Sequence, residues 1–419
     1  MIKNIRCAGS GLKPAQGGRL KHGKMKGDLK VEVSKRSDSI TPSLTRALFN
    51  KAKLYDNVID LTLGDPDFNT PEPVKEAAIA AIRANKTHYS ANAGVLEIRK
   101  AISDHIEKIW PVKSDPETDV IITVGGMEAI YLAMLSIVDE GDEVIIFAPY
   151  YVNYEQMIRM CGGKCVVMDC YNSETGIDID TKKLKRYITK KTKAIIVNSP
   201  NNPTGAIFPE ETLGEIAEIA AENDLIIISD EVYRTLTYDN KEHNSILKFE
   251  QAKDRTILID SMSKEYSMTG FRAGYAWGPA PFIASMTKLQ ENVAACAAVP
   301  SQYAMLYAYI NEPDTSYMRE AFEKRRDYLC ARLSKMPHIK FYKPAGTFYL
   351  MADISAFNMG SVEFAYDLLD KAQLAIVPGR AYGESYDGFV RIAFTKEIDV
   401  LEEAMDRLEV YLNDERNFN

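Results

Sequence analysis

The stretch KAIIVNSPNNPTGAIFPEETLGEIAEIAAENDLIIISD, residues 193–230, contains the unit that decides the fold. Its two apolar runs, 193–198 and 225–230, are nearly continuous, which is typical of strands that are buried on both faces. Between them, residues 209–224 place apolar side chains at helical spacing. A strand, a helix and a second strand in this order predict a parallel sheet that is covered by helices.

Five further apolar runs continue this pattern through the middle of the chain, and helical segments separate several of them. The runs are DVIITV (119–124), EVIIFA (143–148), KCVVMD (164–169), RTILID (255–260) and AGYAWG (273–278). We therefore expect an α/β fold in which a large domain, residues 71–305, contains a mostly parallel, seven-stranded sheet.

The order of segments changes after about residue 305, where a long charged helix is followed by strands, a second helix, more strands and a last helix. This order predicts a smaller α+β domain over residues 306–419. The stretch 33–70 precedes the parallel sheet, and we expect it to join the smaller domain. A chain of 419 residues is too long for one simple core, so two domains agree with its length.

The charge of the chain is distributed unevenly. Its net charge of −8 argues against nucleic acid as the main partner, although residues 1–32 begin with a basic, Gly- and Ser-rich segment. We interpret residues 1–32 as a disordered extension; a nucleic-acid or targeting role, and translation from Met25, remain open alternatives. No apolar run approaches the ~18 residues that a membrane span needs, so no membrane partner is expected.

The six cysteines are too few for a disulfide scaffold in a chain of this size, which indicates a reducing cytoplasm. Three of them cluster, namely Cys161, Cys165 and Cys170. No histidine or fourth cysteine lies near this cluster in the sequence, so we expect no metal site there.

Residues that follow the strands carry the chemical information, because ligands bind beyond the carboxyl ends of strands in open parallel sheets. Gly126 and Met127 follow the run 119–124 and open a helix, where backbone amides can approach an anion. Tyr151 follows the run 143–148 and can either stack on a planar ring or simply pack. Asn202, in SPNNPTG, lies in a rigid turn that presents an amide.

Two more strand ends carry ionisable side chains. Asp230 ends the run 225–230, with Tyr233 three residues later, and a buried carboxylate at this position needs a cationic partner. In SMSKEYSMTGFRAGY (261–275), Lys264 lies among small hydroxyl residues and is followed by Arg272. A lysine that is partly desolvated near a second cation loses basicity and becomes a usable amine nucleophile.

One ligand fits these parts together: pyridoxal 5′-phosphate. Its aldehyde needs a lysine, its pyridine nitrogen a carboxylate, and its ring face an aromatic side chain. Its phosphate needs a cation and backbone amides, and Arg272, Ser261 and Ser263 would form an anion cage of that size with the amides of Gly126 and Met127.

The same residues resemble the signatures of a known family, the class I pyridoxal-phosphate aminotransferases of fold type I, which include aspartate and aromatic aminotransferases. The resemblance extends from about residue 33 over nearly the whole chain. It implies that Lys264 is the lysine that binds the cofactor as a Schiff base and acts in catalysis with Asp230 and Tyr233. The other cofactor contacts implied by the resemblance are Tyr151, Asn202, Gly126, Met127, Ser261, Ser263 and Arg272.

Three further matches concern the substrate and the assembly. Arg391, in GFVRIAF, resembles the arginine that binds the substrate α-carboxylate, and Gly64, in LGDPDFNTP, resembles a glycine beside the substrate, where Asn202 also lies. Tyr89, in THYSANAG, resembles a tyrosine that reaches the phosphate of the neighbouring subunit. The resemblance therefore implies a homodimer with shared active sites.

The implied reaction moves an amino group from an L-amino acid to a 2-oxo acid in two half-reactions. A pyridoxal-phosphate-dependent carbon–sulfur β-lyase on the same fold is the alternative, because it would share the same motifs. Met127 stands where some aspartate-specific relatives have lysine, which favours an apolar or aromatic substrate. The residues that we expect to set specificity are Ile40, Thr41, Tyr89, Met127 and the stretch 295–302, and no motif names the preferred donor.

Overall fold

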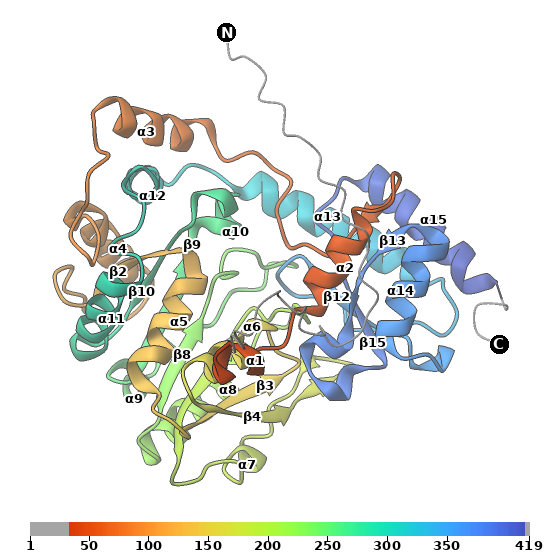
Figure 1. Ribbon diagram of the computed structural model, residues 1–419, viewed down its shortest axis with the longest axis horizontal. Coiled ribbons are helices and arrows are strands. Elements are labelled where there is room, and N and C mark those ends of the chain that lie inside the picture. Colours follow the sequence, from red (N-terminus) through yellow and green to blue (C-terminus); the bar gives the residue numbers. More distant parts are fainter. Residues whose placement is uncertain (1–32, 415–419) are drawn as a thin grey trace, which may run out of the picture.

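The computed structural model describes residues 33–414 (Figure 1). The basic extension, residues 1–32, lies outside the described residues, so its interpretation stays a prediction. No helix within the described range combines the length and the apolar character that crossing a membrane requires.

All seven apolar runs form strands of one sheet, as the sequence predicts. The strands are β2 (Val120–Val124), β3 (Glu143–Ala148), β4 (Lys164–Asp169), β7 (Thr192–Asn198), β8 (Ile226–Asp230), β9 (Thr256–Ser261) and β10 (Ala273–Trp277). Their order in the sheet is β2-β10-β9-β8-β7-β3-β4. Only β10 runs antiparallel to its neighbours, β2 and β9, so the expectation of a mostly parallel sheet is confirmed.

Helices cover both faces of this sheet because its strands are apolar on both sides. On β7, Ile196 packs in one layer and its neighbour Ile195 in the opposite layer. The first layer contains α5 (Gly125–Ile137), α6 (Asn153–Met160) and α11 (Ala280–Val293). The opposite layer contains α8 (Glu210–Glu222). In that layer, three further helices cover β2 and β10: α3 (Glu72–Arg83), α4 (Leu96–Ile109) and α12 (Val299–Asn311).

A second, smaller sheet lies toward the C-terminal end of the chain. It has the order β11 (Lys340–Phe341), β12 (Tyr349–Asp353), β15 (Phe389–Ala393) and β14 (Val377–Pro378). Its helices are α13 (Ser316–Leu333), which is cyan in Figure 1, and α14 (Ser361–Ala372) and α15 (Ile398–Asn413), which are blue. These elements share one apolar core, in which residues of both sheet and helices are buried.

The segment before the large sheet packs with this C-terminal part. β1 (Ile59–Asp60) pairs in parallel with β13 (Leu374–Ala375), and α2 (Leu44–Ala52) buries Leu48 against Leu369. The red α2 therefore lies beside blue elements in Figure 1. The shorter elements are α1 (Lys35–Ser39), β5 (Tyr171–Asn172), β6 (Gly176–Ile177), α7 (Thr181–Leu184), α9 (Glu250–Lys253) and α10 (Met262–Glu265).

The expected domain boundary between residues 305 and 306 falls inside α12. This helix continues to Asn311 and packs along α3 and α4 of the large domain. An uninterrupted helix that packs on one domain belongs to that domain, so we propose a boundary after Asn311, before α13 begins.

Candidate active site

A cavity of about 490 Å³ opens where the parallel strands end and the smaller sheet approaches. Every cofactor and substrate contact that the motifs indicate, except Tyr89, lines it. Those residues are Gly64, Gly126, Met127, Tyr151, Asn202, Asp230, Tyr233, Ser261, Ser263, Lys264, Arg272 and Arg391. The fold thus brings together side chains that are as far apart in the sequence as Gly64 and Arg391.

Lys264 lies on the short helix α10, directly after β9, and its ammonium group donates a hydrogen bond to the carbonyl oxygen of Gly64 at 2.7 Å. No ion pair of Lys264 occurs among the residues that the structure describes. Burial lowers the pKa of its amine; the nearby Tyr349 and Asp65 oppose this shift, and Arg391 and Arg272 add to it. A larger fraction of the amine is therefore neutral than in a free lysine.

Asp230 is the last residue of β8 and is 3% exposed. Burial raises the pKa of its carboxyl group to about 6. The hydroxyl of Tyr154, on α6, donates a hydrogen bond to Asp230 Oδ2 at 2.5 Å and opposes this rise. Within residues 33–414 no cation pairs with Asp230, so its carboxylate is available to a cationic group in the cavity.

Arg391 lies on β15 of the smaller sheet and is 4% exposed. Its guanidinium donates to the carbonyl oxygen of Thr62 at 2.6 Å and to Asn202 Oδ1 at 3.1 Å. The ring of Tyr349 lies 4.0 Å from the guanidinium carbon. The buried Nε has no partner in the described part of the chain, and no carboxylate there pairs with the guanidinium. The site therefore offers an uncompensated cation to an anion.

The start of α5 forms the other end of the cavity. Its first residues, Gly125 to Met127, have backbone amides without intrahelical partners, which favours an anion. Gly274 of β10 lies so close that an added Cβ would be 2.7 Å from the nitrogen of Gly126. Arg272, which precedes β10, has a left-handed backbone conformation (φ 53°) and lies against the same turn.

Sequence reasoning missed several residues of the cavity wall. The hydroxyl of Tyr349 lies 3.3 Å from that of Tyr233, and Tyr382 lies over the guanidinium of Arg391. Tyr154 contacts Asp230, as described above. The segment PYYVNYEQM carries three tyrosines, and this density is the one sequence signal that could have indicated Tyr154. Other wall residues that the motifs did not indicate include Thr45, Arg46, Thr62 and Asn198.

Most of the expected specificity residues lie elsewhere. Met127 lines the cavity, and the hydroxyl of Tyr151 lies 3.3 Å from its sulfur. Ile40, Thr41 and the stretch 295–302 are not part of the cavity wall. Tyr89 is 88% exposed on the surface of this single chain.

The comparisons with known proteins agree with this geometry. The model of the family described as aminotransferase class I and II matches residues 56–408. This chain belongs to that family. The aminotransferase is 38% identical to an aspartate aminotransferase of Pyrococcus abyssi and 36% identical to aromatic-amino-acid aminotransferase 2 of Thermococcus litoralis, each match covering 92% of this chain and all of the relative.

The solved structure of the aspartate aminotransferase from Thermotoga maritima superposes with a TM-score of 0.86 at 36% identity, over 91% of this chain and all of that one. This family uses pyridoxal phosphate, and the fold and the enzyme class predicted from the sequence are confirmed: the chain is a pyridoxal-phosphate-dependent aminotransferase. These relatives give the lyase alternative no support.

The residues present fit pyridoxal phosphate. The cavity offers an amine of lowered pKa at Lys264, a buried carboxylate at Asp230 that pairs with no cation in the described part of the chain, and the first backbone amides of α5 beside Arg272. When bound, the cofactor accepts the electrons that remain on the substrate α-carbon after its proton leaves.

Proposed function

We propose that amino transfer takes place in this cavity, with Lys264 as the group that binds the cofactor and moves the substrate proton. One observation carries the proposal: an amine of lowered pKa and an uncompensated guanidinium, Lys264 and Arg391, line one cavity together with a buried carboxylate. An L-amino acid would bind through its α-carboxylate to Arg391, and a 2-oxo acid would bind in the same way in the second half-reaction.

Each remaining residue then has a physical task. The neutral amine of Lys264 would take the proton from the substrate α-carbon. The protonated amine would then donate this proton to the cofactor carbon to which Lys264 had been bonded. Asp230 keeps the cofactor's pyridine nitrogen protonated through its negative charge. Tyr233 and Asn202 would bind the cofactor's phenolic oxygen. Gly64 leaves room for Tyr349 beside the substrate, because any side chain at position 64 would meet that tyrosine.

The phosphate would lie at the start of α5. The groups around that position are the amides of Gly126 and Met127, the hydroxyls of Ser261 and Ser263, and the guanidinium of Arg272. The ring of Tyr151 would stack on the cofactor.

Replacement of the lysine tests the proposal. Lys264→Ala should abolish both the visible absorbance of the lysine-bound cofactor and amino transfer, because no other amine lines the described cavity. Lys335→Ala is the matched control, since Lys335 is an exposed lysine in the turn after α13 and does not line the cavity. Retention of both signals by Lys264→Ala would refute the assignment.

We also propose that the donor has an apolar or aromatic side chain and that the acceptor is a dicarboxylic 2-oxo acid. Met127 presents an apolar side chain to the substrate. Of the cations that line the described cavity, Arg46 alone has no task in binding the cofactor or the α-carboxylate, so it can meet a second carboxylate. The relatives named for aspartate and for aromatic amino acids are almost equally similar, so identity does not choose between them.

A panel of amino donors with 2-oxoglutarate as the acceptor tests this substrate proposal. Aromatic or apolar donors should give the highest kcat/KM. Arg46→Met should raise the KM for 2-oxoglutarate and leave that for pyruvate unchanged, because pyruvate has no second carboxylate. An equal effect on both acceptors would contradict the role of Arg46.

We further propose a homodimer that works in the cytoplasm. The exposure of Tyr89, an aromatic side chain outside its own chain's cavity, supports a contribution to a partner's site. The described cysteines are free thiols, as is usual in a reducing compartment.

A further inference from the structure

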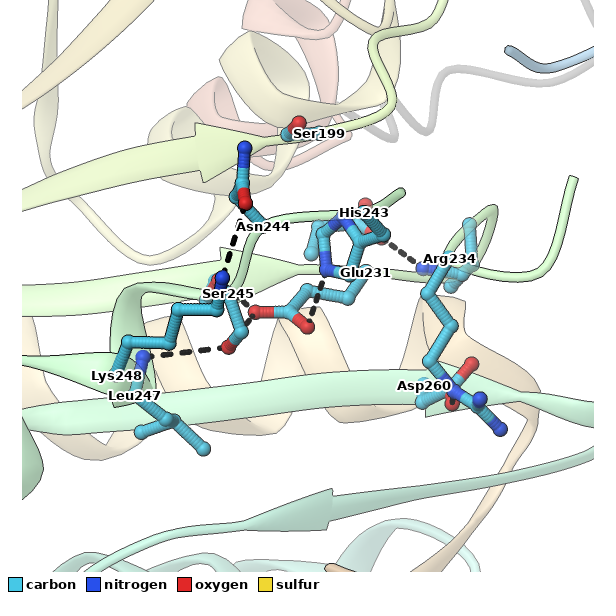
Figure 2. Close-up of polar contacts among 12 residues, drawn as sticks. Ser199, Glu231, Arg234, His243, Asn244, Ser245, Leu247, Lys248 and Asp260 are labelled. Carbon is cyan, nitrogen blue, oxygen red and sulfur yellow. Dashed lines mark hydrogen bonds and ion pairs between the residues drawn. The ribbon is translucent and has the colours of Figure 1, made fainter. Parts of the chain in front are cut away.

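Glu231 follows Asp230 in the chain, yet its side chain points away from the cavity. It is 2% exposed and is not among the residues that line the cavity, whereas its neighbours Asp230 and Val232 line it. Its Oε1 accepts hydrogen bonds from the hydroxyls of Ser229 at 2.8 Å and Ser245 at 2.7 Å. Its Oε2 lies 2.7 Å from Nε2 of His243 (Figure 2).

Two of these partners, His243 and Ser245, lie at the C-terminal end of one long loop, residues 232–245. The loop leaves the large sheet after Glu231, and its middle enters the core of the smaller domain, where Leu236 and Tyr238 are buried. Thr237 pairs with Gly346, and Asp239 forms an ion pair with the buried Arg326 of α13. The loop then returns, and His243 and Ser245 bind the carboxylate at which it began.

Every polar group of Glu231 is used in this arrangement. Its backbone N–H donates to the carbonyl oxygen of Ile259 on β9, and its carbonyl oxygen accepts from the N–H of Arg234 in the turn that carries Tyr233. Figure 2 shows this last bond beside the side-chain contacts. A buried carboxylate is costly unless it is fully hydrogen-bonded, so the side chain is locked in one position.

His243 supplies a donor from a position that is itself buried, since its side chain is 5% exposed. Nδ1 of the ring has no hydrogen-bond partner in the described structure, and the ring stands edge-on to Trp110. A proton on Nδ1 would be a buried donor without an acceptor, so the tautomer with the proton on Nε2, directed at Glu231, satisfies the most groups. Within residues 33–414 no lysine or arginine forms an ion pair with Glu231.

We infer that Glu231 is a positioning residue, which closes loop 232–245 at its base and thereby fixes Asp230 and Tyr233 relative to each other and to the smaller domain. The inference rests on the cofactor-binding roles proposed above for those two residues. Glu231 touches neither the substrate nor the cofactor site. It acts through the strand end and the turn to which it is bonded.

The test uses the full-length enzyme loaded with pyridoxal phosphate. Glu231→Gln keeps the shape of the side chain but removes its charge and one acceptor, and it should raise the cofactor Kd about tenfold, because small misplacements of a site are expensive. It should also shift the pH midpoint of the bound cofactor's absorbance, and lower kcat more than it changes KM. Ser245→Ala, which removes one donor, should shift Kd and midpoint in the same direction by a smaller factor.

Glu242→Gln is the matched control, because Glu242 is an exposed glutamate of the same loop, and it should match the wild type. A folded Glu231→Gln variant with wild-type Kd and midpoint would overturn the inference, even if its melting temperature fell, since a purely structural role predicts that result. If Glu231→Gln does not fold, a wild-type Kd for Ser245→Ala overturns it equally. Asp230→Asn with wild-type kcat/KM for amino transfer would instead contradict the proposed function.

Discussion

Gly64 is a position where one added methyl group should disturb the proposed substrate site. A Cβ at this residue would lie 1.5 Å from the hydroxyl of Tyr349, whose ring stacks on the guanidinium of Arg391. Gly64→Ala should therefore displace Tyr349, cost about 1–3 kcal/mol of stability and raise the KM for the amino donor. Gly270→Ala is the control, because a Cβ there meets no atom within 4 Å. Equal kinetics for the two variants would contradict this account of the wall.

Asp230 should give the cofactor-free protein a measurable pH dependence. The folded-state pKa of about 6 lies above the ordinary value of 3.8, so the folded protein binds this proton more tightly than the unfolded chain does. The resulting stabilisation is complete below pH ~4 and is lost as the pH rises through 6, and the shift corresponds to about 3 kcal/mol.

Asp230→Asn removes this titration. The free energy of unfolding of the wild type, measured relative to that of Asp230→Asn, should therefore fall between pH 4 and pH 7. Denaturant unfolding of both cofactor-free proteins across this range measures the difference. A difference that does not change with pH would show that Asp230 has an ordinary pKa.

At the residue scale, the motifs indicated the cavity residues that directly follow strands, but not several residues that other elements bring to the cavity wall. Lys264 and Asp230 could be found because each follows an apolar strand, where the chemistry of a parallel sheet is concentrated. Tyr349 could not be found in this way, since the hydroxyl that it approaches, on Tyr233, is 116 residues away in the chain. A tyrosine within a strand of apolar residues is typical of a core position until the two domains are placed together.

At the element scale, β10 is the exception in the parallel sheet, and its direction was not predicted. An apolar run has the same composition in either direction, so periodicity carries no information about it. The connection from β9, over residues 262–272, is shorter than the dozen or more residues that a parallel crossover needs. This short connection is the sequence signal that favours an antiparallel β10.

The antiparallel β10 also places Gly274 against the turn that opens α5. A Cβ at Gly274 would lie 2.7 Å from backbone atoms of Gly125 and Gly126, and backbone cannot give way as a side chain can. Gly274→Ala should therefore move these amides away from the proposed phosphate site and raise the Kd of pyridoxal phosphate by about tenfold. Binding of pyridoxal, which lacks the phosphate, should change little. A loss of the same size for both ligands would indicate general damage to the sheet instead.

At the scale of the whole molecule, the site is assembled from both ends of the chain. Gly64 lies in the segment that precedes the large sheet, and Arg391 lies on the last strand of the smaller one. Pairing of β1 with β13 brings these two ends together, because it ties the N-terminal segment to the C-terminal part. The sequence indicated that stretch 33–70 joins the smaller domain, but it contained no pairing signal for the two-residue strands that make the connection.

Tyr89 allows a test of the assembly with mixed dimers. If Tyr89 completes the partner's site, each site takes its Lys264 from one chain and its Tyr89 from the other. A dimer of one Lys264→Ala chain and one Tyr89→Ala chain then contains one site with both defects and one site with none. Mixing the two variants under conditions that exchange subunits should therefore raise the activity above that of Tyr89→Ala alone, toward a site of wild-type kcat/KM. If Tyr89 served its own chain, no mixed dimer would contain an intact site, and the activity would only fall with dilution by the inactive Lys264→Ala chain.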